Sequence, residues 1–118
     1  MSRQFKFRVW DILGKRMLQW GDIFNLPAWE IFPGTPEQRA FNVMQYTGLK
    51  DKNGREIYEG DFIQNENTIG EIEWVQEHCA FMAFTRNPSF YRYLESDGQL
   101  NLTEIIGNIY ENPELIEV

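Results

Sequence analysis

The chain has 118 residues, 42% of them hydrophobic and 15% aromatic, which is enough to bury one core without disulfides. It holds no run of about 18 apolar residues and does not start with an apolar leader, so we expect no membrane span and no signal peptide. The single cysteine, Cys79, cannot form an internal disulfide. We therefore expect a soluble, reduced protein of the cytoplasm.

The net charge of −7 is distributed unevenly along the chain. Residues 1–55 carry nine basic and five acidic side chains, whereas residues 56–118 carry two basic and thirteen acidic ones. These two parts can neutralise each other within one monomer, or they can pair head to tail between copies. Nucleic-acid binding by the whole protein is disfavoured, because it requires a basic face.

The first predicted element is a β-hairpin over residues 4–20. In "QFKFRVWD" the apolar side chains of Phe5, Phe7 and Val9 alternate with Gln4 and polar neighbours, a pattern typical of a half-buried strand. "ILGKR" supplies the turn and "MLQW" returns as the second strand.

Residues 21–44 are predicted to form a variable excursion with short helical pieces. Three prolines and two glycines interrupt this stretch. Thr35 as N-cap and Pro36 at the first helical position predict one or two helical turns. Long loops often bind partners, so this segment is a candidate partner surface.

Glycine-containing turns separate several short strands in the rest of the chain. "NVMQYTG" is predicted as a strand, followed by an Asn53-Gly54 turn and a Gly60-Asp61 turn. "DFIQN", "IGEIEWVQEHCAFMAFT" and "TEIIGNIYEN" supply further strands, the second of them as two strands or one long bent strand.

This pattern predicts a mainly β fold: a small SH3-like barrel with an N-terminal β-hairpin extension and short helical pieces. We expect one domain, with the hairpin at residues 4–20, the excursion at 21–44 and the barrel at 45–118. An immunoglobulin-like sandwich fits less well, because the chain lacks seven clear strands and a cysteine pair.

Three segments resemble the YopX family of phage and prophage proteins. These are "FKFRVWD" near the start, "MQYTGLKDKNGREIYEGDFI" in the middle and "IIGNIYENPELI" at the end. The resemblance implies a phage or bacterial origin, a mostly β fold with an SH3-like barrel and a homo-oligomer. It implies no activity, because the family is uncharacterised. Residues 18–44 depart from the pattern in length and content.

Residues of these motifs are candidates for a site, but each also has a structural interpretation. Glycines supply backbone freedom in turns, and tyrosines offer an apolar ring with a polar end. We interpret the signature as a structural corner, with a binding site as the alternative. Its residues are Tyr46, Gly48, Asn53, Gly54, Tyr58, Gly60, Asp61, Gly107 and Asn108.

No catalytic or metal-binding constellation stands out, so we expect a non-enzyme without cofactors. His78 and Cys79 are neighbours, and on a strand they would point to opposite faces, which predicts a buried Cys79 and a surface His78. Glu59, Asp61 and Glu71 could bind a divalent ion only if the barrel brought their strands together. A metal-dependent hydrolase is therefore a distant alternative.

The segment "FMAFTRNPSFYRYL" places aromatic residues beside arginines. Such a segment serves as core, as protein interface or as a platform for single-stranded nucleic acid. We expect a self-associating module that also binds a protein partner, and the alternative is a small nucleic-acid-binding protein using the basic hairpin. The candidate interaction residues are Tyr91, Arg92, Tyr93, Arg8 and Arg16, and the nucleic-acid alternative adds Arg3, Lys6 and Lys15.

Overall fold

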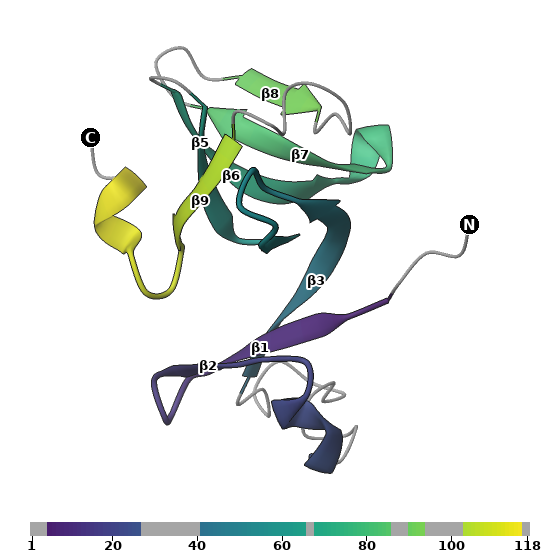
Figure 1. Ribbon diagram of the computed structural model, residues 1–118, viewed down its shortest axis with the longest axis vertical. Coiled ribbons are helices and arrows are strands. Elements are labelled where there is room, and N and C mark those ends of the chain that lie inside the picture. The colour runs from purple at the N-terminus through teal and green to yellow at the C-terminus, as the bar shows by residue number, and fades with distance from the viewer. Residues whose placement is uncertain (1–4, 27–40, 66–67, 86–89, 94–102, 117–118) are drawn as a thin grey trace. The chain divides into compact units, whose positions relative to one another are not determined.

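The computed structural model describes residues 5–26, 41–65, 68–85, 90–93 and 103–116 (Figure 1). Contacts divide the chain into two compact units, residues 1–46 and 47–118. The boundary falls within strand β3 (Phe41–Lys50), which contributes its first six residues to unit 1 and its last four to unit 2.

Unit 1 is built on a β-hairpin. Strand β1 (Phe7–Asp11) pairs antiparallel with β2 (Arg16–Leu18) on one side and with the start of β3 on the other. A short 3₁₀ turn, η1 (Asp22–Asn25), follows β2. The core of unit 1 is small. Val9 and Ile23 are buried, and the partly buried residues packed against them are Phe7, Leu18, Trp20, Leu26, Phe41 and Val43.

Unit 2 is dominated by a five-stranded antiparallel sheet in the order β8-β7-β6-β5-β9. Strand β4 pairs with the end of β3 instead. Two more 3₁₀ turns are described, η3 (Gln76–His78) and η5 (Pro113–Ile116). The strands of unit 2 after β3 are β4 (Glu56–Tyr58), β5 (Asp61–Asn65), β6 (Thr68–Val75), β7 (Ala80–Thr85), β8 (Phe90–Tyr93) and β9 (Thr103–Asn108).

The core of unit 2 forms from strand residues whose side chains share one face. Ile72 pairs across the sheet with Ala83, and Ile63 with Ile105, and all four are buried. Ile57 of β4 joins this cluster, while Leu49 and Phe81 pack at its edge. Burying a side chain of this size stabilises the fold by about 1.5–3 kcal/mol.

The mainly β fold, the hairpin and the short helical pieces predicted from the sequence are confirmed. Two statements remain predictions: that the sheet closes into an SH3-like barrel, and that the whole chain forms one domain. The helical turn predicted at Thr35 lies outside the described residues. Within the described part of the chain, no helix is long and apolar enough to cross a membrane.

Candidate functional site

The middle signature segment forms a tight hairpin closed by Asp51. The backbone N–H of Asp51 donates to the carbonyl of Arg55 at 2.9 Å, and the N–H of Gly54 donates to the carbonyl of Asp51 at 3.0 Å. Gly54 has a φ of +81°, while Asn53 has no positive φ. A three-residue loop with its last residue in the left-handed region favours glycine at that position. Of the Asn-Gly pair, only Gly54 therefore needs a positive φ.

The Asp51 carboxylate ties this turn to strand β9. Its Oδ1 accepts the N–H groups of Asn53 and Arg55, both at 2.9 Å, and its Oδ2 accepts the N–H of Ile105 at 3.0 Å. Asp51 is 6% exposed. One buried side chain therefore satisfies three backbone donors from two distant segments.

The pKa of Asp51 reflects this environment. Burial acts to raise it, but the N–H groups of Ile105, Arg55 and Asn53 and the charge of Arg55 together hold it below the usual range. The group is therefore a carboxylate at neutral pH, which suits an acceptor of backbone hydrogen bonds and not a proton donor.

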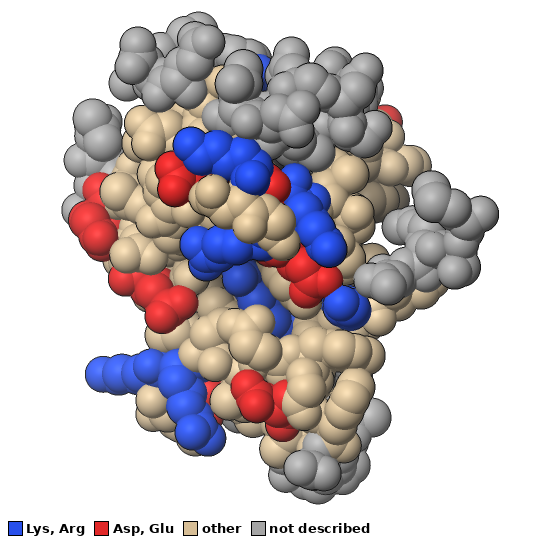
Figure 2. All heavy atoms as spheres, in the orientation of Figure 1, with Lys and Arg blue, Asp and Glu red and all other residues tan. Residues whose placement is uncertain are grey.

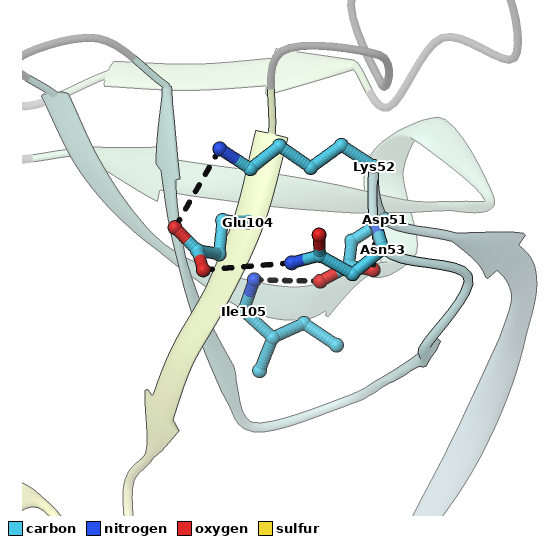
Figure 3. A network of polar contacts seen from close by, with 5 residues as sticks. All are labelled: Asp51, Lys52, Asn53, Glu104 and Ile105. Carbon is cyan, nitrogen blue, oxygen red and sulfur yellow. Dashed lines mark hydrogen bonds and ion pairs between the residues drawn. The ribbon is translucent and has the colours of Figure 1, made fainter.

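Two further contacts join the turn to β9 on its exposed side (Figure 3). Asn53 Nδ2 donates to Glu104 Oε1 at 3.4 Å, and Lys52 Nζ lies 3.7 Å from Glu104 Oε2. The backbone N–H of Lys52 also donates to the carbonyl of Thr103 at 2.9 Å. Exposed ion pairs contribute little stability, so we assign the main role to Asp51.

The second turn of the signature has its own buried carboxylate. Asp61 is 1% exposed, and its Oδ2 accepts the N–H of Tyr58 at 2.8 Å. Gly60, with a φ of +88°, donates its N–H to the carbonyl of Ile72 and accepts the N–H of Ile109. Asp61 is thus engaged in a turn that connects β4 and β5.

The end motif, "IIGNIYENPELI", begins within β9 and continues into a turn that two asparagine side chains stabilise. Asn108 Oδ1 accepts the N–H groups of Tyr110 and Glu111, and Asn112 Oδ1 accepts the N–H of Asn108. The Asn112 side chain lies so close to Gly107 that a Cβ there would sit 2.6 Å from its Oδ1. Gly107 is required for close approach, because larger residues would displace Asn112.

The candidate metal ligands do not form a metal site. The structure places Asp61 on the Tyr58 turn, and β5 pairs Phe62 with Glu71. Among the residues that the structure describes, no group of three or more His, Cys, Asp and Glu side chains could hold a metal ion.

The basic residues of the hairpin have different environments. Arg8 is 7% exposed, so this candidate contact is buried and does not offer its charge at the surface. Arg16 is largely exposed, with Nε 3.8 Å from Oδ2 of Asp11. Arg16 begins β2 and is the last residue of an exposed hairpin tip, Ile12–Arg16, in which Leu13 is 84% exposed.

Strand β8 does not present Tyr91 and Arg92 on the same face of the sheet. The register places Tyr91 opposite Phe84, Arg92 opposite Ala83 and Tyr93 opposite Met82. Adjacent strand positions alternate between faces, so Arg92 and Tyr91 point to opposite sides of the sheet. The Tyr91 ring, 46% exposed, lies 4.9 Å from the ring of Phe84.

The prediction of a buried Cys79 is wrong. Cys79 is exposed and follows η3 at the connection between β6 and β7, with a φ of +49°. The alternation argument failed because the chain leaves the strand at Val75 and turns before β7 begins. His78, also exposed, lies in the same turn.

This exposure leads to a simple prediction for thiol chemistry. In the native protein, Cys79 should react with an aqueous thiol reagent as fast as it does in urea, since no unfolding is needed to reach Sγ. Absorbance of the released chromophore measures both rates. A native rate far below the denatured rate would contradict the exposed position.

Several residues that organise the site were missing from the predicted set. Asp51 and Asn112 supply the caps just described, and Thr47 Oγ1 donates to the carbonyl of Ile57 at 2.8 Å. The signal for Asp51 was its place two residues before Asn53 in a turn, where an aspartate binds nearby N–H groups. Trp74, 43% exposed on β6, gave no such signal.

Comparison with known proteins finds a similar solved structure and a matching family model. The chain is similar to the crystal structure of protein EF1440 from Enterococcus faecalis, with 28% sequence identity, a TM-score of 0.60 and coverage of 98% of this chain and 99% of that one. A search of curated proteins gave no match. The family model described as YopX protein matches residues 6–117, and the chain therefore belongs to the YopX family.

Proposed function

We propose that this protein is a non-catalytic, phage- or prophage-encoded accessory protein of the host cytoplasm that acts as a self-associating protein-interaction module. The contacts of the middle signature segment support a non-catalytic role, because the buried carboxylates of Asp51 and Asp61 accept backbone hydrogen bonds that hold its turns. The observation that carries the proposal is the exposed apolar tip of the β1–β2 hairpin. A module of this kind would also use such a surface for a partner protein.

The hairpin tip, residues Ile12–Arg16, combines apolar and basic side chains at one projecting point. Leu13 is 84% exposed and Ile12 42%, and Lys15 and Arg16 follow directly. Adjacent exposed apolar side chains are typical of surfaces that bind another protein. Basic side chains next to such a surface orient the partner and raise the rate of association with an acidic surface.

Asp11 holds the tip in one conformation. Its Oδ1 accepts the N–H of Gly14 at 3.0 Å, and its carbonyl accepts the N–H of Lys15 at 2.7 Å. Lys15 has a φ of +55°, and a Cβ on Gly14 would lie 2.6 Å from Asp11 Oδ2. A tip ordered before binding loses less conformational entropy when it docks.

We assign the receiving surface to a region of unit 2, the Trp74 corner, defined as Trp74, Gln76, Glu77 and Phe81. The indole Nε1 of Trp74 donates to Gln76 Oε1 at 3.0 Å, and its ring meets that of Phe81 edge-on at 5.1 Å. The indole is thereby fixed with 43% of the residue exposed. Tryptophan is among the residues that dominate binding energy at interfaces.

Charge favours a second copy of this chain as the occupant of the corner. Glu77 is exposed beside Trp74, and residues 56–118 carry thirteen acidic and two basic side chains. Lys15 and Arg16 of the tip are complementary to this surface, and Leu13 would contact the indole. A tip-to-corner contact joins two different surfaces, so it is head to tail.

Sedimentation velocity tests the role of the tip. Leu13→Ser should shift the association to at least tenfold higher concentration, since burying a leucine side chain in a contact contributes about 1.5–3 kcal/mol. At concentrations where the parent protein is monomeric, the melting temperature should not change, because Leu13 is exposed in the monomer. Gln19→Ser, at another exposed position of unit 1, is the matched control and should associate like the parent protein.

Two outcomes would contradict the proposal. One is a parent protein that sediments as a monomer at all concentrations. The other is a Leu13→Ser variant that associates as well as the parent protein. Moderate salt should weaken the association without abolishing it, because only its ionic part is screened.

Nucleic-acid binding is the weaker alternative. Arg8 is buried, Arg16 lies beside Asp11, and Arg92 points away from the Tyr91 face. On the face drawn in Figure 2, Lys and Arg side chains lie next to Asp and Glu. A phosphate contact would make affinity for single-stranded DNA fall steeply with salt, and no binding at low salt would remove this alternative.

A further inference from the structure

The signature turn contains a chemically labile pair. Asn53 is the one asparagine of the chain that is followed by glycine. Glycine has no side chain to hinder attack by its own nitrogen on the preceding side-chain amide, and Asn53 is exposed to water. The pair lies at the tip of the Asp51–Arg55 turn.

We infer that Asn53 is a site of spontaneous deamidation and that the Asp51 cap controls its rate. In the reaction the Gly54 nitrogen forms a bond to Asn53 Cγ, the Cγ–Nδ2 bond breaks and ammonia leaves with the proton of the Gly54 N–H. Water then opens the resulting succinimide ring at either carbonyl. The products are aspartate or isoaspartate, and no oxidant or reductant is needed.

The folded turn holds both reacting groups away from this path. The Gly54 N–H donates to the carbonyl of Asp51 at 3.0 Å, so the attacking nitrogen is engaged. Asn53 Nδ2 donates to Glu104 Oε1 at 3.4 Å, and the Asn53 N–H donates to Asp51 Oδ1 at 2.9 Å. Reaction therefore requires local opening of the turn, whose rate depends on the Asp51 contacts.

The product would damage the turn in two ways. A carboxylate at position 53 replaces a donor with an acceptor opposite Glu104, so an attraction becomes a repulsion. Isoaspartate also adds one carbon to the main chain, inside a turn closed by the 2.9 Å bond from Asp51 N to the Arg55 carbonyl. The contacts between this turn and β9 would therefore weaken as deamidation proceeds.

Peptide mass spectrometry after incubation at mildly alkaline pH tests the inference. The mass gain of an amide-to-acid change should appear first in the peptide containing Asn53, and Asn53→Gln should lack it. Asp51→Ala should speed the change about tenfold or more, because opening becomes easier. Glu104→Ala, which keeps the Asp51 cap, should speed it less.

The parent protein in urea gives the rate without any fold, so the test does not depend on whether Asp51→Ala folds. The folded parent protein should react several-fold more slowly than in urea. Equal deamidation rates in the folded protein and in urea would contradict the inference that the folded turn controls the rate. A first mass gain at another asparagine would overturn the site itself.

Discussion

Replacing Asp51 with alanine is expected to lower the free energy of unfolding by about 3 kcal/mol. The substitution removes the acceptor of three backbone N–H groups, those of Asn53, Arg55 and Ile105. The Ile105 N–H is the costliest of the three to leave unpaired, because this hydrogen bond is buried. Urea unfolding followed by tryptophan fluorescence measures the change.

The matched control is Asp22→Ala. Asp22 Oδ2 accepts the N–H of Gln19 at an exposed position, where water replaces the lost partner. This variant should lose about 0.5–1 kcal/mol. If the two alanine variants were equally stable, the role assigned to Asp51 would be wrong.

The pH dependence has a defined sign. The folded pKa of Asp51 lies below its unfolded value, which is about 3.8. The stability that Asp51 contributes is therefore fully present above that unfolded value, and it is lost as the pH falls through the lower folded pKa. The difference in unfolding free energy between the parent protein and Asp51→Asn should be constant near neutral pH and shrink in acid.

Gly107→Ala is expected to destabilise unit 2 by about 2 kcal/mol. An added Cβ would lie 2.6 Å from Asn112 Oδ1 and 2.7 Å from its Cγ, so Asn112 would be pushed from its bond to the Asn108 N–H. The cause is crowding rather than backbone strain, since Gly107 has no positive φ. Urea unfolding again provides the measurement.

A double-mutant cycle separates crowding from other effects. Asn112→Gly alone should destabilise by removing the acceptor, but Gly107→Ala should then cost much less, because nothing is left to collide with. Gly21→Ala is the control, with no atom within 4 Å of its added Cβ. If the losses of unfolding free energy from the two substitutions were additive, crowding between positions 107 and 112 would be contradicted.

The sequence predicted those parts of the fold that depend on local chemistry. The alternation of apolar and polar residues over Phe7–Val9 and the glycine at position 14 were sufficient to predict the first hairpin. Strands β1 and β2 pair as expected. Gly54 and Gly60 were predicted to supply backbone freedom, and both have positive φ. Turn glycines are predictable because their conformation is set by immediate neighbours.

Residues whose role depends on distant segments were harder to predict. Asp51 was missed because its third donor, Ile105, is 54 positions away. Arg8 was taken for a surface contact because alternation places it opposite apolar residues, yet it is buried. Cys79 was misplaced because the three residues of η3 (Gln76–His78) interrupt the strand and turn the chain just before it. For Asp51 and Arg8, contacts between segments distant in the sequence decide the outcome, and local patterns do not reveal them.

Mixing two association-deficient variants tests the central claim most directly. In the proposed contact, Leu13→Ser would lack a working tip and Trp74→Ser a working corner, whereas the mixture would hold one intact tip and one intact corner. Sedimentation velocity should find each variant monomeric alone and a one-to-one complex in the mixture. A mixture that remains monomeric while the parent protein associates would contradict docking of the tip on the Trp74 corner.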